Sequence, residues 1–301
     1  MKRKVVKHGS STLTISLPSK WAKRFNIRQG DELHVEEKER SLVISTDKNY
    51  AWEKATIDLN KIGFFNKNLI SNVYHVGYDE VELFYDGIDV LRQVIQRLSD
   101  CIGYEIVNQS EKRCVIRSIS TISDTEFDKV LSRTFLVTLS MAKDMHEAIK
   151  SREFHRLKDL RVLESTNNKF TDYCRRILNK KGYKTAKMTP TMYSLVHDME
   201  KIGDDYKHIC DLLEGQKGPI SKETLRIFEE VNDYFETFYR LFYKFDKERA
   251  EKMFSKGKMI IKNAFALYSK KPVIEIKLLT YLINLTTKIY ELTLPYFEMN
   301  L

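Results

Sequence analysis

The spacing of apolar side chains changes character twice along this chain. Up to about residue 48, apolar residues alternate with polar ones over short runs, which predicts strands covered on one face. Alternating runs and helical spacing then take turns as far as about residue 122, and helical spacing continues from there to the end. The pattern predicts a multidomain α+β protein with a β-rich head, a small α+β middle unit and an all-helical body.

The head, residues 1–48, has the pattern of a strand, a short helix and a hairpin. Residues 13–17 alternate and predict a half-buried strand, which Pro18 ends. A helix is expected over 19–25 and a hairpin over 33–44. Domains this small usually need disulfides, a metal or a partner, and the head has no disulfide or metal-binding pattern. We therefore expect an obligate two-fold dimer.

The middle unit, residues 50–122, alternates between strand and helix patterns. Strands are expected over 55–59 and 81–85, helices over 61–72 and 89–99, and a hairpin over 104–117. Asp79, Glu80 and Glu82 fit a solvated strand edge better than a catalytic group. The expected role is dimerisation or spacing, with a ligand pocket as the alternative.

The helical body is expected to contain six helices in two groups of three. They are expected over 123–152, 153–181, 189–214, 221–245, 247–269 and 273–297. Gly218 and Pro219 interrupt the helical spacing, so a duplicated three-helix bundle is predicted, with repeats at 123–216 and 219–301. The late apolar stretch is interrupted by charged residues, which predicts a core helix and no membrane insertion.

The fourth of these helices is rich in aromatic residues. It carries Tyr234, Phe235, Phe238, Tyr239, Phe242, Tyr243 and Phe245. They cover more than one helical face, so the helix is expected to be buried on several sides or to lie at an oligomer interface.

Positive charge is concentrated at the start of the chain. Eight of the 51 Lys and Arg residues lie within the first 28 positions, where no Asp or Glu occurs, and the whole chain has a formal net charge of +9. A basic end on a nearly neutral remainder predicts a polyanionic partner. A solubilising tail is the alternative, but tails are disordered and this segment alternates like a strand.

The cysteines have neither the spacing of a zinc site nor that of a disulfide framework. They are Cys101, Cys114, Cys174 and Cys210. We expect buried apolar residues in a reducing compartment. The first residues are charged rather than apolar, so no signal peptide is predicted and a cytoplasmic location is expected.

One run in the head resembles a known DNA-binding family. Residues 7–33 contain a glycine near the first strand, a strand that ends in proline, a short helix and the pattern Ile-x-x-Gly-Asp-x-Leu. This resembles the AbrB/MazE/SpoVT swapped-hairpin domain over nearly all of residues 1–48. The resemblance implies an intertwined dimer that binds DNA through basic residues near the first strand and the loop and helix that follow. The candidates on this sequence are Arg3, Lys4, Lys7, Ser10, Ser11, Lys20, Lys23 and Arg24.

The chemistry of these residues supports the same role. Lys and Arg neutralise phosphates and release counterions, and Ser10 and Ser11 are short donors suited to the DNA backbone. Arg3 and Arg24 are expected to reach base edges, because a guanidinium can donate two hydrogen bonds to guanine. Any single lysine in the set is equally well explained as a solvated charge. Trp21 is expected to anchor the core rather than stack on a base.

A pair of carboxylates marks the third expected helix. Glu200 and Asp204 lie four residues apart, on one helical face. Such like charges cost about 0.2–0.5 kcal/mol in an isolated helix, and a hard or borderline cation between them would reverse that cost. From the spacing alone, a solvated acidic face beside Lys201 and Lys207 is the favoured interpretation.

The residues around this pair resemble the PhoU family. The run 195–205 is similar to a PhoU helix with Leu-Glu-Arg-Ile-(Ala/Gly)-Asp-His. The run 163–168 is similar to the matching Glu-x-x-x-Asp helix, with Asn168 in place of Asp. The resemblance covers about 125–301. It implies two tandem three-helix bundles, a role in phosphate uptake, and the multinuclear metal clusters that several PhoU proteins bind through these carboxylates.

The resemblance also implies a set of metal ligands. By position these are Glu164, Glu200 and Asp204 in the first repeat, for at most one divalent or iron-type ion. In the second repeat Asn284 and Lys288 stand where Glu and Asp are usual, so no metal is expected there. An enzyme is not predicted, because no nucleophile, general base or complete ligand set is visible.

A swapped-hairpin head followed by a PhoU-like helical body resembles the archaeal type of PhoU-related regulator. They imply a homodimeric or higher oligomeric transcription factor that binds operator DNA near phosphate-uptake genes, with the helical body sensing or transmitting the signal. The alternative is an adaptor that docks on a phosphate transporter or a signalling protein, with DNA binding secondary. An antitoxin role, which the MazE-like head alone suggests, is disfavoured by the large helical body.

Overall fold

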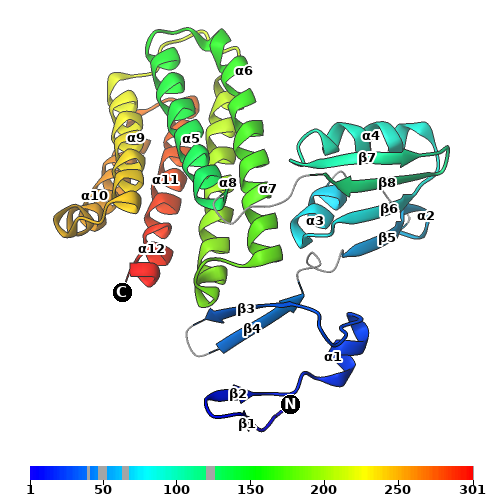
Figure 1. Ribbon diagram of the computed structural model, residues 1–301. Helices are drawn as coiled ribbons and strands as arrows, with labels where there is room; N and C mark the ends of the chain where they lie inside the picture. The colour runs from blue at the N-terminus through cyan, green and yellow to red at the C-terminus, as the bar shows by residue number, and fades with distance from the viewer. Residues whose placement is uncertain (39–40, 47–52, 63–67, 120–125, 301) are drawn as a thin grey trace. The chain divides into compact units, whose positions relative to one another are not determined.

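A computed structural model divides the chain into two compact units, Met1–Glu53 and Lys54–Leu301. The structure describes residues 1–38, 41–46, 53–62, 68–119 and 126–300. The head lies in the first unit, and the middle unit and helical body form the second (Figure 1).

The head contains two antiparallel hairpins joined by a short helix. Its elements are β1 (Val6–His8), β2 (Thr12–Thr14), α1 (Ser19–Arg24), β3 (Leu33–Lys38) and β4 (Ser41–Thr46). Gly9, in the turn between β1 and β2, has a φ of 70°, a left-handed conformation that glycine adopts without steric cost. The predicted order of strand, helix and hairpin is confirmed. Strand β1 was not predicted, because its three residues are too few to show an alternating pattern.

The head has no interior of its own. None of its residues whose exposure is described is buried. Leu13 is 70% exposed, Val35 58% and Leu42 63%. The prediction of a half-buried strand over 13–17 is therefore wrong for a single copy. The strand ends at Thr14, and its apolar side chains meet solvent because nothing else in the unit covers them.

Trp21 is the nearest approach to a core anchor in the head. Its side chain is half-buried, and its ring centroid lies 5.7 Å from that of Phe25. This contact holds α1 together, but it leaves both hairpins without apolar cover.

The middle unit is a four-stranded mixed sheet. Its elements are β5 (Lys54–Asp58), α2 (Leu59–Ile62), α3 (Asn68–Val76), β6 (Glu80–Phe84), α4 (Ile88–Leu98), β7 (Tyr104–Gln109) and β8 (Arg113–Ser118). The strand order is β5-β6-β8-β7, with β6 parallel to β5 and antiparallel to β8. Helices α3 and α4 contact each other. Of the helix predicted over 61–72, the structure describes the two ends as parts of α2 and α3, and residues 63–67 lie outside the described residues.

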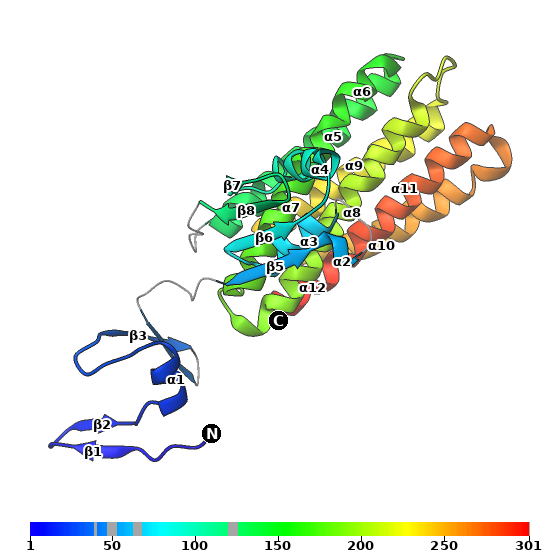
Figure 2. The same cartoon turned by 90° about the vertical axis from the view of Figure 1, so that its right-hand side faces the viewer.

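The helical body contains six long helices in the part of the chain that the structure describes. Its helices are α5 (Glu126–Lys150), α6 (Leu157–Leu160), α7 (Val162–Lys181), α8 (Thr189–Leu213), α9 (Lys222–Tyr243), α10 (Lys247–Phe265), α11 (Val273–Glu291) and α12 (Thr293–Asn300), with 3-10 turns at Phe154–Arg156, Ala186–Met188 and Tyr268–Lys270. Helices α5, α7 and α8 pack together, as do α9, α10 and α11 (Figure 2). Contacts between α5 and α9 and between α8 and α11 join the two groups.

Two of the predicted helices are divided in the structure. The single helix expected over 153–181 is broken by a 3-10 turn and α6, so α7 begins only at Val162. The last expected helix divides at Leu292 into α11 and α12. The predicted start at residue 123 lies outside the described residues.

The aromatic run of α9 lies mostly in the core of the helical body. The ring centroid of Phe135, from α5, lies 6.1 Å from that of Phe235 and 5.4 Å from that of Phe242. Tyr243 and Phe245, at the end of the run, are 47% and 54% exposed. Most of these rings are therefore buried or half-buried, while α9 has an exposed polar face formed by Arg226, Glu229, Asp233, Glu236 and Arg240.

The late apolar stretch is also part of the core. Leu278, Leu282, Leu285 and Ile289 of α11 are fully buried. Among the described helices, none has the length and apolar character needed to cross a membrane.

Arg176 of α7 joins the helical body to the middle unit. Its side chain is almost fully buried and donates to the carbonyls of Tyr74 (3.0 Å) and Tyr78 (2.8 Å) and to the hydroxyl of Tyr104 (3.1 Å). The two carbonyls lie at and just beyond the end of α3, where a helix leaves carbonyls without an intrahelical donor. Arg176 therefore caps α3 from a distant part of the chain.

Asp79, Glu80 and Glu82, which were predicted to lie on a solvated strand edge, form ion pairs instead. Asp79 is buried and pairs with Lys180 of α7. Glu80 and Glu82 lie on β6, an inner strand, where Glu80 pairs with Arg117 of β8 at 2.7 Å and Glu82 also pairs with an arginine of β8. The prediction is wrong because β8 returns beside β6 and supplies cations across the sheet.

Replacing Arg176 by Met is expected to lower the free energy of unfolding by about 3 kcal/mol, because three acceptors in the interior would each lose a charged donor. Denaturant unfolding of the full chain measures this change. Arg133→Met, at an exposed position of α5, is the matched control and should stay within about 0.5 kcal/mol of the wild type. Equal stabilities for the two variants would contradict the capping role.

Candidate nucleic-acid interface

The eight predicted DNA-binding residues are all exposed in the head. Lys7 lies on β1, and Ser10 and Ser11 lie in the turn that Gly9 opens between β1 and β2. Lys20, Lys23 and Arg24 lie on α1, and Arg3 and Lys4 lie in the segment that precedes β1. The structure thus brings three candidates onto one hairpin and three onto one six-residue helix.

The positive charge of the head is not compensated locally. Among the described residues, none of these lysine and arginine side chains has an acidic partner. The guanidinium carbon of Arg24 lies 5.5 Å from the ring centroid of Phe25, a cation–π arrangement that leaves its donors available. Lys23 and Arg24 also occupy the last turn of α1, where a helix favours cations.

Sequence reasoning left two comparable residues out of the candidate set. Lys2 and Arg28 are exposed, and within the described part of the chain their side chains have no acidic partner. The charge count in the first 28 residues was the signal that could have included them.

The predicted metal ligands lie on two adjacent helices of the body. Glu164 and Asn168 lie on α7, and Glu200 and Asp204 lie on α8. The amino group of Lys207 lies 2.7 Å from Oε1 of Glu164 and 2.7 Å from Oδ1 of Asp204. A cation from the chain therefore already bridges two of the three predicted ligands.

Ionisation in this cluster follows from the bridge. Burial opposes the charge on Lys207, but the hydrogen bonds to Asp204 and Glu164 outweigh it, and the pKa of Lys207 is raised. Burial also opposes the charge on Asp204, but hydrogen bonds from Lys207 and Lys201 outweigh it and lower the pKa of Asp204. Lys207 and Asp204 are therefore both charged at neutral pH.

The third predicted ligand faces a different cation. Glu200 pairs with Arg175, whose guanidinium nitrogen also lies 2.9 Å from Nδ1 of His197. In the described part of the chain, no group of three or more His, Cys, Asp or Glu side chains is arranged to hold one metal ion. The residues present do not fit a metal as they stand, since Lys207 and Arg175 supply the positive charge.

In the second repeat, Lys288 also approaches a carboxylate. Its amino group lies 2.5 Å from Oδ2 of Asp205 on α8. Burial raises the pKa of Asp205, and the hydrogen bond from Lys288 only partly opposes that shift. This contact joins α8 to α11 across the two groups of helices.

The four cysteines are free and buried, as predicted. Burial raises the pKa of Cys101 to about 12 and that of Cys114 to about 11. The thiolate form is strongly disfavoured at neutral pH, so these two thiols are poor nucleophiles.

Comparison with protein families supports the assignment of the head. The family described as antidote-toxin recognition MazE, bacterial antitoxin, matches residues 6–52. Comparisons with curated proteins and with solved structures gave no match. Residues 6–52 are therefore a MazE/AbrB-type swapped-hairpin DNA-binding domain, and a helical region follows it in the same chain.

Proposed function

We propose that this protein is a transcription regulator that binds operator DNA as a homodimer. One observation carries the proposal: a MazE/AbrB-type head presents a concentrated set of exposed cations, and the described part of the chain gives them no acidic partners. Phosphate oxygens are the natural counter-charges for such a set. The serines of the first turn add short donors for the DNA backbone.

The lack of an interior in the head supports the dimer. Leu13 and Leu42 expose apolar surface whose burial would contribute roughly 1.5–3 kcal/mol per side chain. A second copy presents the same strands, and a two-fold axis would cover each pair of hairpins with its twin. Pairing also doubles the positive surface available to one duplex.

Replacing Arg3 and Arg24 by Ala is expected to weaken duplex binding at least tenfold, at about 1–3 kcal/mol for each guanidinium that reads a base. Each phosphate contact removed should also lower the slope of log affinity against log salt concentration by about 0.9. Gel-shift titrations at several salt concentrations measure both effects.

Lys258→Ala, an exposed lysine of α10, is the matched control for loss of positive charge. It should leave affinity and slope unchanged. If the Arg3→Ala/Arg24→Ala variant behaves like this control, the proposed DNA-binding surface of the head is wrong.

The helical body is assigned a sensing or transmitting role in phosphate uptake. The support is the PhoU-like residue pattern in α7 and α8, together with two groups of three packed helices. A signal that favours one helical arrangement would change DNA affinity through linkage.

Capture of chromosomal DNA at high and low phosphate tests this role and its alternative. A regulator should occupy phosphate-uptake promoters differently in the two conditions. An adaptor would instead retain its transporter or signalling partner when Arg3 and Arg24 are replaced by Ala. Equal promoter occupancy at high and low phosphate would contradict a role in phosphate uptake.

The chain is assigned a binding role rather than an enzymatic one, and Lys207 takes the place of a metal in the first repeat. Lys207→Ala would remove the cation that bridges Glu164 and Asp204, and would leave Lys201 paired with Asp204. It is expected to bind Mn²⁺ at least tenfold more tightly than the wild type, measured by calorimetry. Adding Asp204→Asn should abolish the gain. Equal Mn²⁺ affinity for the wild type and Lys207→Ala would contradict the substitution of metal by lysine.

A further inference from the structure

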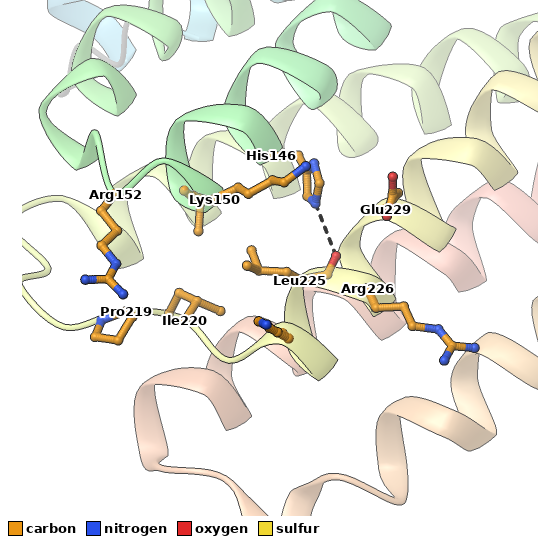
Figure 3. A pocket seen from close by; sticks show the side chains of 10 residues that line it. His146, Lys150, Arg152, Pro219, Ile220, Leu225, Arg226 and Glu229 are labelled. Carbon is orange, nitrogen blue, oxygen red and sulfur yellow. Dashed lines mark hydrogen bonds between the residues drawn. The ribbon is translucent and has the colours of Figure 1, made fainter.

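A cavity of about 370 Å³ opens between the end of α5 and the start of α9 (Figure 3). Its volume is within the range of small-molecule pockets in proteins. Ile149, Ile220 and Leu225 supply apolar lining, and Lys150, Arg152 and Lys222 supply positive charge. None of these residues belongs to the DNA-binding head or to the carboxylate cluster.

The charges at this cavity are unbalanced. Lys150, Arg152 and Lys222 have no acidic partner among the residues described. Arg226, also in the lining, is neutralised by Glu230 at 3.0 Å. Glu229 is the one acidic residue of the lining. Three uncompensated cations therefore face a single carboxylate.

Arg152 has a backbone conformation that indicates a role beyond ending the helix. Its φ is 61°, in the left-handed region that is costly for a side chain as long as arginine. The amide of Glu153 donates to Ala148 and that of Arg152 to Ile149, the hydrogen-bond pattern of a Schellman motif, in which glycine is usual at this position. The chain thus keeps an arginine where glycine would be more stable, and the side chain extends toward Pro219 (Figure 3).

The walls of the cavity are held in place without a ligand. Nε2 of His146, on α5, lies 3.2 Å from the carbonyl of Leu225 on α9, and its ring packs against that of Phe228 at 5.5 Å. The cavity therefore spans the two groups of helices and is formed in advance, which lowers the ordering cost of binding.

The start of α9 is not the source of the attraction. The amide and hydroxyl of Ser221 already donate to the buried carboxylate of Glu275. The unpaired side-chain cations at the cavity are Lys150, Arg152 and Lys222, in the part of the chain that the structure describes.

We propose that this cavity binds a small organic anion with two or more negative charges, a phosphate ester or a polycarboxylate. The charged groups would pair with Lys150, Arg152 and Lys222, and the carbon skeleton would lie on Ile149, Ile220 and Leu225. Because the cavity joins α5 to α9, such a ligand stabilises one packing of the two groups of helices.

Calorimetry on the full chain tests the proposal, with ATP and citrate as the organic probes and inorganic phosphate for comparison. At least one organic probe is expected to bind once per chain and at least tenfold more tightly than inorganic phosphate. The double variant Lys150→Gln/Lys222→Gln should bind that probe at least tenfold more weakly. Lys258→Gln, outside the cavity, and Arg3→Ala/Arg24→Ala, in the head, should bind it as the wild type does.

Arg152→Gly provides a readout that a purely structural role would not give. It should leave the melting temperature unchanged or raise it, because glycine relieves the left-handed strain, while it weakens probe binding. The proposed site would be overturned if neither ATP nor citrate bound, or if inorganic phosphate bound as tightly as these probes do. It would also be overturned if Lys150→Gln/Lys222→Gln bound the organic probe as tightly as the wild type does.

Discussion

The head of this protein must cover apolar strand faces that it cannot bury by itself. Two short hairpins and a six-residue helix enclose no buried residue in the part described, and Leu13, Val35 and Leu42 meet solvent. Hydrophobic burial is the main stabilising term for a domain, so a unit without it needs a second surface. In the proposed dimer, a twin copy supplies that surface and joins two sets of cations. Folding and DNA recognition would then depend on the same pairing.

In the second unit, side-chain cations from the chain itself satisfy buried acceptors. Arg176 caps the end of α3, Lys207 bridges Glu164 and Asp204, and Lys288 reaches Asp205. Each contact joins segments that are far apart in sequence or lie on different helices. A buried charge that loses its partner is costly, so such contacts fix how helices pack more than they add net stability. The cavity between α5 and α9 differs, because three of its cations, Lys150, Arg152 and Lys222, have no such partners in the described part of the chain.

The layout of the fold follows from periodicity, because one apolar face per element is visible in the sequence. Strand β6, helix α4 and most of the six long helices lie close to their predicted positions. The break after Arg152 was also predicted, but the 3-10 turn and α6 that delay the start of α7 to Val162 were not. Strand β1 was missed because three residues are too few to show alternation.

The candidate sites also divide into those that the sequence reveals and those that depend on tertiary packing. The basic head was visible because its charge is local in sequence, and Lys207 lies three residues after Asp204, so its bridge was within reach of helical spacing. Arg176 could not be assigned, since its acceptors lie about a hundred residues earlier. The cavity was also hidden, because its walls come from helices that only tertiary packing brings together.

Hydrogen–deuterium exchange of the full chain over a series of protein concentrations tests the central claim most directly. The account predicts that amide protection in β1 to β4 declines together with the dimer fraction, while protection in the helical body stays high. Protection of these strands that persists at concentrations where sedimentation finds only single chains would contradict it.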